Sequence, residues 1–220
     1  MRILFLSTDS FIPDHFSCRN KTLLELCGQL KQLGHEPLVA CGPPNVATSQ
    51  GVVVDRSYGF RIFRCKHLVR DSSALCATLR PDIAIIAGDR FRDLIEACSP
   101  LEFPLAAWFF QLDSCCDLDR SNNDILHLAS SPFLAVRLRT LFGLKIEVVA
   151  PYVDKAAYHG LQRGRRVVFV NPIREKGVEL AFTLAEVRPE YGFLFVESGK
   201  ISDQWRADCY MRALGCGNLE

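Results

Sequence analysis

A short segment near the C-terminal end of the chain combines an apolar strand pattern with a cation. Val167–Val170 is a largely β-branched run that stops at an Asn-Pro pair, and Lys176 and Gly177 then precede a helical pattern. A strand–loop–helix unit leaves backbone N–H groups unpaired where the helix begins, and the helix dipole favours anions there. The segment therefore indicates a phosphate-binding site at Lys176. The alternative is a solvated surface lysine, which Glu175 beside it would suit.

Polar residues also follow the first apolar strand, and their position is the argument for a second site. Ser17, Arg19 and Asn20 lie between an expected strand at 2–7 and an expected helix at 20–33. Open α/β sheets bind ligands at the carboxyl ends of their strands, so this loop is a candidate ligand loop. The ordinary alternative is helix capping, and the Asn20 side chain is expected to cap the helix.

Further polar side chains follow other expected strands, but no general base can be chosen among them. They share a place at the expected sheet edge and no other distinguishing feature: Asp9, Asp89, Gln111 and Asp113. His127 lies inside an expected strand, where a packed histidine is the simpler interpretation. No catalytic residue is assigned.

Strand and helix patterns alternate along the chain, which predicts an α/β protein with a parallel sheet covered on both faces. The expected strands are 2–7, 37–41, 51–54, 60–63, 83–87, 104–110, 124–129, 146–150, 166–170 and 192–197. The expected helices are 20–33, 71–79, 90–98, 132–142, 176–187 and 203–214. Right-handed crossovers then give a Rossmann-like domain over 1–150, a linker at 151–165 and a second, incomplete Rossmann-like βαβα segment over 166–220.

The second segment has only two expected strands, which bury too little apolar surface to stand alone. Three explanations remain open: it packs on the first domain, a partner chain completes it, or the chain is cut short.

Composition excludes several classes of function. The chain has 220 residues with a formal net charge of +1, which gives no support for nucleic-acid binding. No apolar run has the ~20 residues of a membrane span, and the apolar start at Arg2–Leu6 is too short for a signal peptide. The ten cysteines form no C-x-x-C pair, so we expect reduced thiols, no metal site and a cytoplasmic protein. The adjacent Cys115 and Cys116 leave a redox role as a minor alternative.

Several segments, in order and spacing, resemble the GT-B glycosyltransferases and, among them, the retaining family 4 type. The resemblance covers most of the chain and rests on these stretches: Arg2–Leu6, Phe11-Ile12-Pro13, Leu33-Gly34-His35-Glu36, Arg80-Pro81-Asp82, Ala129-Ser130-Ser131, Val149–Asp154, Phe169–Pro172 with Lys176-Gly177, and Arg188-Pro189-Glu190. By this resemblance the second domain is truncated.

The resemblance implies transfer of a sugar from a nucleotide-sugar donor to an acceptor hydroxyl, with retention and without a metal or other cofactor. It places the donor diphosphate on the second domain, near Lys176, Arg174, Asn171 and Gly177. It places the acceptor, which is a sugar, a lipid or a small molecule, on the first domain near the four residues Ser17, Arg19, Asn20 and Gln111. Members often act on lipid-linked acceptors, so peripheral membrane contact is left open.

The sequence departs from the family pattern at four places. The family's Gly-Arg after the first strand of the second domain is Asn171-Pro172 here, and Arg174 stands out of register. The glycine-rich loop before the first helix is replaced by Phe16–Arg19, and Gln111 stands where a histidine is common. The acidic motif that grips the donor sugar is not contained in the chain.

Two other functions remain as alternatives. The chain is either a non-catalytic or split binding subunit that needs a partner, or a nucleotide-sugar epimerase of similar architecture. A dehydrogenase is disfavoured because no G-x-G-x-x-G opens a helix after the first strand.

Overall fold

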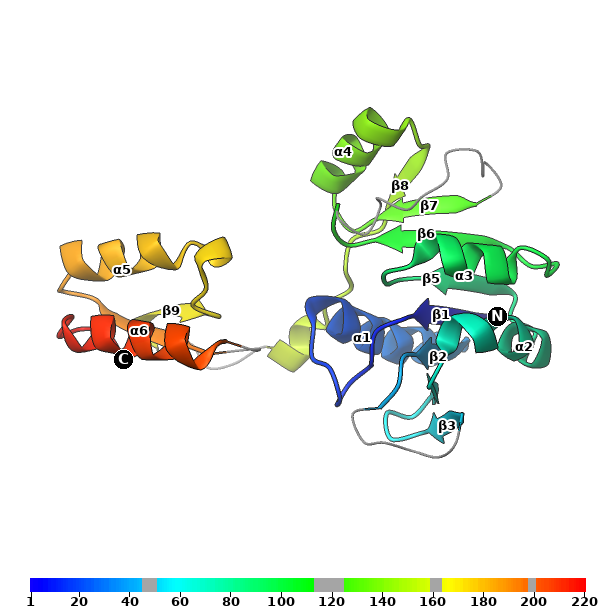
Figure 1. The fold of residues 1–220 in the computed structure, drawn as a ribbon, viewed down its shortest axis with the longest axis horizontal. Helices are drawn as coiled ribbons and strands as arrows, with labels where there is room; N and C mark the ends of the chain where they lie inside the picture. The colour runs from blue at the N-terminus through cyan, green and yellow to red at the C-terminus, as the bar shows by residue number, and fades with distance from the viewer. Residues whose placement is uncertain (45–50, 113–124, 159–163, 198–200) are drawn as a thin grey trace. The chain divides into compact units, whose positions relative to one another are not determined.

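The computed structural model describes residues 1–44, 51–112, 125–158, 164–197 and 201–220. The chain divides into two compact units, Met1–Ala157 (unit 1) and Tyr158–Glu220 (unit 2), and each is described by itself (Figure 1). The boundary between the units lies inside the range 151–165.

Unit 1 is built on an eight-stranded sheet in the order β3-β4-β2-β1-β5-β6-β7-β8. All neighbouring strands are parallel except β3 and β4, which form an antiparallel pair. The strands are β1 (Arg2–Ser7), β2 (Glu36–Cys41), β3 (Val52–Asp55), β4 (Arg61–Cys65), β5 (Ile83–Ile86), β6 (Leu105–Phe109), β7 (Leu126–Ala129) and β8 (Ile146–Val148).

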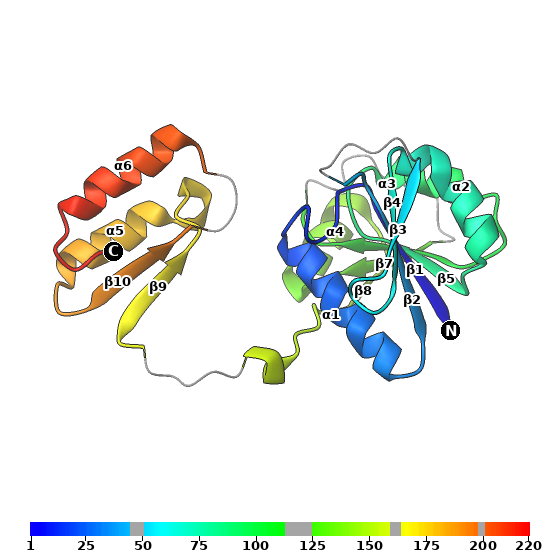
Figure 2. The same ribbon diagram turned by 90° about the horizontal axis from the view of Figure 1, so that it is seen from below.

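Both faces of this sheet carry a hydrophobic core, because successive side chains of a strand point to opposite faces. Leu4 and Leu6 of β1 belong to one core, which also contains side chains of α2 (Leu68–Leu79), α3 (Phe91–Cys98) and α4 (Pro132–Phe142). Ile3 and Phe5 of β1 belong to the other core, which contains side chains of α1 (Cys18–Gln32). Helices α1 and α2 accordingly lie on opposite sides of the sheet (Figure 2).

Unit 2 is a smaller βαβα arrangement with two parallel strands, β9 (Arg166–Val170) and β10 (Gly192–Val196). Its helices are α5 (Val178–Val187) and α6 (Asp203–Leu214), and a short 3₁₀ turn covers Arg174–Lys176. Another 3₁₀ turn, Lys155–Tyr158, lies at the boundary between the two units. The core of unit 2 contains Phe182 and Phe193, against which Phe169, Phe195 and Trp205 pack. The chain then returns to β10, where Leu219 forms a parallel bridge with Phe193.

The α/β prediction is confirmed, and each expected helix and strand is present with ends that agree to within a few residues. The helix expected at 176–187 begins later, at Val178, because Gly177 has a φ of +81°, which ends the preceding 3₁₀ turn. The helix expected at 132–142 has the expected ends. Ser131 accepts a hydrogen bond from the Leu134 N–H, and Gly143 is left-handed. Among the described residues, every helix is too short or too polar to cross a bilayer.

Candidate functional site

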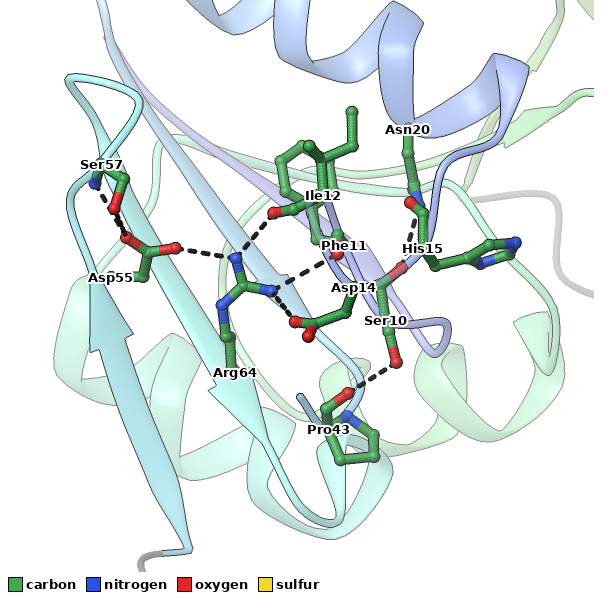
Figure 3. A network of polar contacts seen from close by, with 10 residues as sticks. All are labelled: Ser10, Phe11, Ile12, Asp14, His15, Asn20, Pro43, Asp55, Ser57 and Arg64. Carbon is green, nitrogen blue, oxygen red and sulfur yellow. Dashed lines mark hydrogen bonds and ion pairs between the residues drawn. The ribbon is translucent and has the colours of Figure 1, made fainter. Parts of the chain in front are cut away.

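The loop between β1 and α1 is held by a buried arginine of β4 (Figure 3). The Arg64 side chain is 6% exposed and lies between two carboxylates. Its guanidinium donates to Asp14 at 2.8 Å and to Asp55 at 2.7 Å. It also donates to the backbone carbonyls of Ile12 at 2.7 Å and Phe11 at 3.5 Å. One side chain therefore joins the loop to the β3–β4 hairpin.

The hydrogen bonds around the Asp55 carboxylate lower its pKa and keep it ionised. Burial acts to raise its pKa, but hydrogen bonds from Ser57 and Arg64 outweigh burial and lower the pKa to about 2. Ser57 donates to Asp55 through both its hydroxyl and its backbone N–H. A buried guanidinium is costly unless its donors are satisfied, and these partners satisfy it.

Asn20 does not cap α1, which corrects the expectation from the sequence. The N-cap is Ser17, whose hydroxyl accepts from the Asn20 backbone N–H at 3.1 Å, so α1 begins earlier than expected. The Asn20 side-chain amide instead donates to the carbonyls of Ser10 and His15, both at 2.9 Å. The Asn20 side chain is fully buried and fixes the loop from the helix side, opposite Arg64 (Figure 3).

Arg19 lies at the carboxyl end of β1 between two acidic residues. It forms an ion pair with Asp9 and lies 4.0 Å from Asp89. Burial lowers the pKa of Arg19 below its ordinary value, and the charge of Asp89 opposes this shift. The structure therefore brings Asp9 and Asp89, which follow different strands, to the same cation.

Three buried polar atoms near this point have no hydrogen-bond partner among the described residues: Ser7 Oγ, Arg19 Nε and Asn20 Oδ1. All three belong to the end of β1 or the start of α1. Buried polar groups are usually paired, so unpaired ones gathered at a strand's carboxyl end are expected of a ligand site. Ser17, Arg19 and Asn20 are thus placed together.

The remaining polar residues of the expected sheet edge are only partly informative. Gln111 follows β6 and is exposed, whereas Asp113, Cys115 and Cys116 lie outside the described residues. His127 is 6% exposed and stacks on Phe109 with ring centroids 6.1 Å apart. Burial lowers the pKa of His127, in agreement with a packed histidine.

In unit 2 the predicted phosphate residues lie between β9 and α5. Asn171 has a φ of +63°, and its N–H donates to the carbonyl of Val196 at 2.7 Å. The Arg174 guanidinium lies over the Trp205 ring, 5.0 Å from the centroid. Lys176 is exposed, and its ammonium forms no hydrogen bond or ion pair with the residues that the structure describes.

The first turn of α5 has no side-chain cap, because its N-cap is Gly177. The Val178 N–H donates to the Ile173 carbonyl at 3.4 Å. The N–H groups of Glu179 and Leu180 are the ones left without an intrahelical partner or a capping side chain. Lys176 directly precedes this N-cap, as the sequence predicted. Among the described residues, no group of three or more His, Cys, Asp or Glu side chains is placed to hold a metal ion.

Arg64 was not found from the sequence. It stands in an apolar strand beside Phe63 and Cys65, and its acidic partners are 9 and 50 positions away. A charged residue inside an apolar strand is the one signal that marked it.

Comparison with known structures agrees with this architecture. No protein-family model matches the sequence, and no curated protein matches it. A glycosyltransferase from Rickettsia africae matches 100% of the chain with a TM-score of 0.70 at 11% identity. An α-glucosyltransferase in complex with UDP-glucose and DNA matches 98% with a TM-score of 0.61 at 13% identity. AviGT4, a glycosyltransferase of avilamycin A biosynthesis, matches 100% with a TM-score of 0.61 at 13% identity.

These likenesses define the class of fold. The chain has the architecture of the GT-B glycosyltransferases. It covers 67%, 61% and 62% of the lengths of the three matched proteins.

Proposed function

We propose that the chain takes part in glycosyl transfer from a nucleotide-sugar to an acceptor hydroxyl, with retention, as in family 4 enzymes. The donor diphosphate binds at the start of α5, and the acceptor binds on unit 1 at the loop formed by Ser17, Arg19 and Asn20. Gln111 lies on the acceptor side. The observation that carries the proposal is that the first turn of α5 has no side-chain cap and directly follows Lys176, whose ammonium has no partner among the described residues. The fold is shared with a protein whose structure contains UDP-glucose, which supports the choice of donor.

Lys176 has an electrostatic role in this proposal. As the bond between sugar and diphosphate breaks, negative charge grows on the leaving diphosphate. A fixed ammonium and the N–H groups of α5 stabilise that charge without reorganising. Gly177 and Asn171 contribute backbone groups to the donor site. The Arg174 side chain belongs to the same loop and stays packed over the Trp205 ring. The charge is balanced by these groups in place of a metal ion or other cofactor.

The test is calorimetric titration of the full chain with UDP. Lys176→Ala removes a charge-assisted contact and is expected to weaken binding by roughly 1–3 kcal/mol. Arg188→Ala is the matched control, because Arg188 caps the far end of α5 and pairs with Glu190. EDTA is expected to leave UDP binding unchanged. Equal affinities of wild type and Lys176→Ala would remove Lys176 from the site.

A further inference from the structure

A cavity of about 520 Å³ opens at the carboxyl edge of the unit 1 sheet. Its lining comes from segments that follow four neighbouring strands and includes Thr8, Gly42, Lys66, His67, Arg70 and Arg90. The order β4-β2-β1-β5 places these strand ends side by side. We call this space the β4–α2 cavity. Its volume lies in the range of small-molecule sites, roughly 300–1,000 Å³.

The lining is cationic. It contains Lys66, Arg70 and Arg90, and none of the described residues in the lining carries a carboxylate. Lys66 is exposed, and its ammonium has no hydrogen bond or ion pair with any described residue. Lys66 and Arg70 come from the segment that joins β4 to the first turn of α2, and Arg90 comes from the loop after β5, so two segments bring the three cations to one lining.

The two arginines have acidic neighbours, so among the described residues Lys66 is the cation of the lining that no carboxylate balances. Arg70 pairs with Asp71 at 2.8 Å, and Arg90 pairs with Asp93 at 2.5 Å. The two arginine side chains are 69% and 61% exposed, so these are surface pairs of small net energy. Each guanidinium has five donors and uses only part of them on its neighbour.

The beginning of α2 adds to the same field. Its N-cap His67 makes no side-chain capping hydrogen bond. The Asp71 N–H is bonded to the His67 carbonyl, so the N–H groups of the preceding turn, which lines the cavity, have no intrahelical acceptor. The positive end of the helix dipole therefore lies beside the three cations.

We propose that the β4–α2 cavity binds the phosphate group of a soluble phosphate monoester, and that this ester is the acceptor of the transfer reaction. The proposal rests on the proposed function only for the ester's role as acceptor. A phosphate dianion offers several oxygens to Lys66, Arg70 and Arg90 together, whereas a single carboxylate has too few for three separated cations. The volume leaves room for the rest of a small molecule beside its phosphate. The lining residues all belong to unit 1, whereas Lys176 belongs to unit 2.

The test is a titration of the full chain with glycerol 3-phosphate, with glycerol as the uncharged control. Saturable binding of glycerol 3-phosphate that weakens with added salt is expected, and glycerol should not bind. Lys66→Ala, Arg70→Ala and Arg90→Ala should each weaken binding about tenfold, and the triple variant should abolish it. Arg92→Ala is the matched control, since Arg92 is an exposed arginine of α3 outside the lining. All four residues are exposed, so the variants should fold, and tryptophan fluorescence checks this.

Several results would overturn the proposal. They are wild-type affinity in the triple variant, no saturable binding of glycerol 3-phosphate, or equal binding of glycerol. Binding of the protein to vesicles that contain phosphatidylinositol 4-phosphate, without binding of glycerol 3-phosphate, would also overturn the proposal. A bound ester that a DNA duplex displaces, but that other phosphate monoesters do not, would overturn it as well. Titration of UDP separates the two proposals. If glycerol 3-phosphate binds and the triple variant does not bind it, while UDP does not bind at all, the phosphate site in the cavity is supported and the assignment of the donor site fails.

Discussion

The two sheets of the molecule are built from similarly apolar strands, but the strands differ in how deeply they are buried. In unit 1, β2 and β6 carry apolar side chains on both faces, and almost all of their residues are buried. In unit 2, β9 is equally apolar, yet Val168 and Val170 on one of its faces are 54% and 53% exposed. Helices α5 and α6 cover the other face, where the phenylalanines pack. An apolar strand pattern therefore shows that a strand can be buried on both faces, but it does not show that both faces are covered.

The largest expected effect concerns the small core of unit 2. Phe182→Ala should destabilise unit 2 by about 3–5 kcal/mol, because it removes a fully buried ring from a small core and leaves a cavity among the remaining aromatic side chains. Pulsed thiol labelling in urea reads both units, since Cys209 and Cys216 lie in unit 2 and the buried Cys27 lies in unit 1. Cys209 and Cys216 should become reactive at lower urea, with no change at Cys27.

The matched control is Leu180→Ala on the same helix, where the side chain is 66% exposed. It should change the free energy of unfolding of either unit by no more than about 0.5 kcal/mol. An equal shift at Cys27 in Phe182→Ala would show that the two units unfold together and would remove the contrast.

The second prediction tests unit 1 through its buried cation. Arg64→Met should cost about 3 kcal/mol, the low end for a broken buried ion pair, because Asp14 and Asp55 keep some solvent contact. Arg61→Met, on the same strand, removes a pair with the exposed Glu36 and should cost less than about 1 kcal/mol. Urea unfolding of both variants, made in a Trp205→Phe background so that the fluorescence comes from Trp108, gives the comparison. Equal costs would mean that Arg64 is solvated in solution.

The third prediction concerns acid. Asp55 has an ordinary pKa of 3.8 that the fold lowers to about 2. The unfolded state therefore binds the proton more readily, so this group's stabilisation is complete above about pH 4 and disappears as the pH falls to about 2. Unit 1 of Trp205→Phe, in which Trp108 is the remaining tryptophan, should lose stability over this window. Asp55→Asn should remove that component, and an unchanged acid profile would contradict it.

The smallest effect is expected on the open face of unit 2. Val168→Thr should change the free energy of unfolding by less than about 0.5 kcal/mol, because the hydroxyl reaches water. Val39→Thr places the same hydroxyl in the buried β2 and should cost about 1–3 kcal/mol. Thermal unfolding of both variants is sufficient. A cost at Val168 as large as that at Val39 would show that something covers this face in solution.

Local patterns predicted most of the fold. Apolar runs located the strands, and Ser131, Gly143 and the break after Val170 marked element ends, because these signals depend on near neighbours in the chain. Asn20 was misassigned because its real partners, the carbonyls of Ser10 and His15, come from a loop without periodicity. The β4–α2 cavity was missed for a related reason. Lys66, Arg70 and Arg90 meet only through the strand order, which the sequence does not specify.

Arg64 binds both the β1–α1 loop and the β3–β4 hairpin, and this arrangement affects how the sequence can vary. Residues at Asp55 and Ser57 never touch the start of α1, yet they set the orientation of the guanidinium that holds Phe11 and Ile12. Substitutions in the β3–β4 hairpin can therefore change the shape of the loop between β1 and α1 without touching it. Variation in ligand preference can accumulate there while Arg19 and its neighbours stay the same.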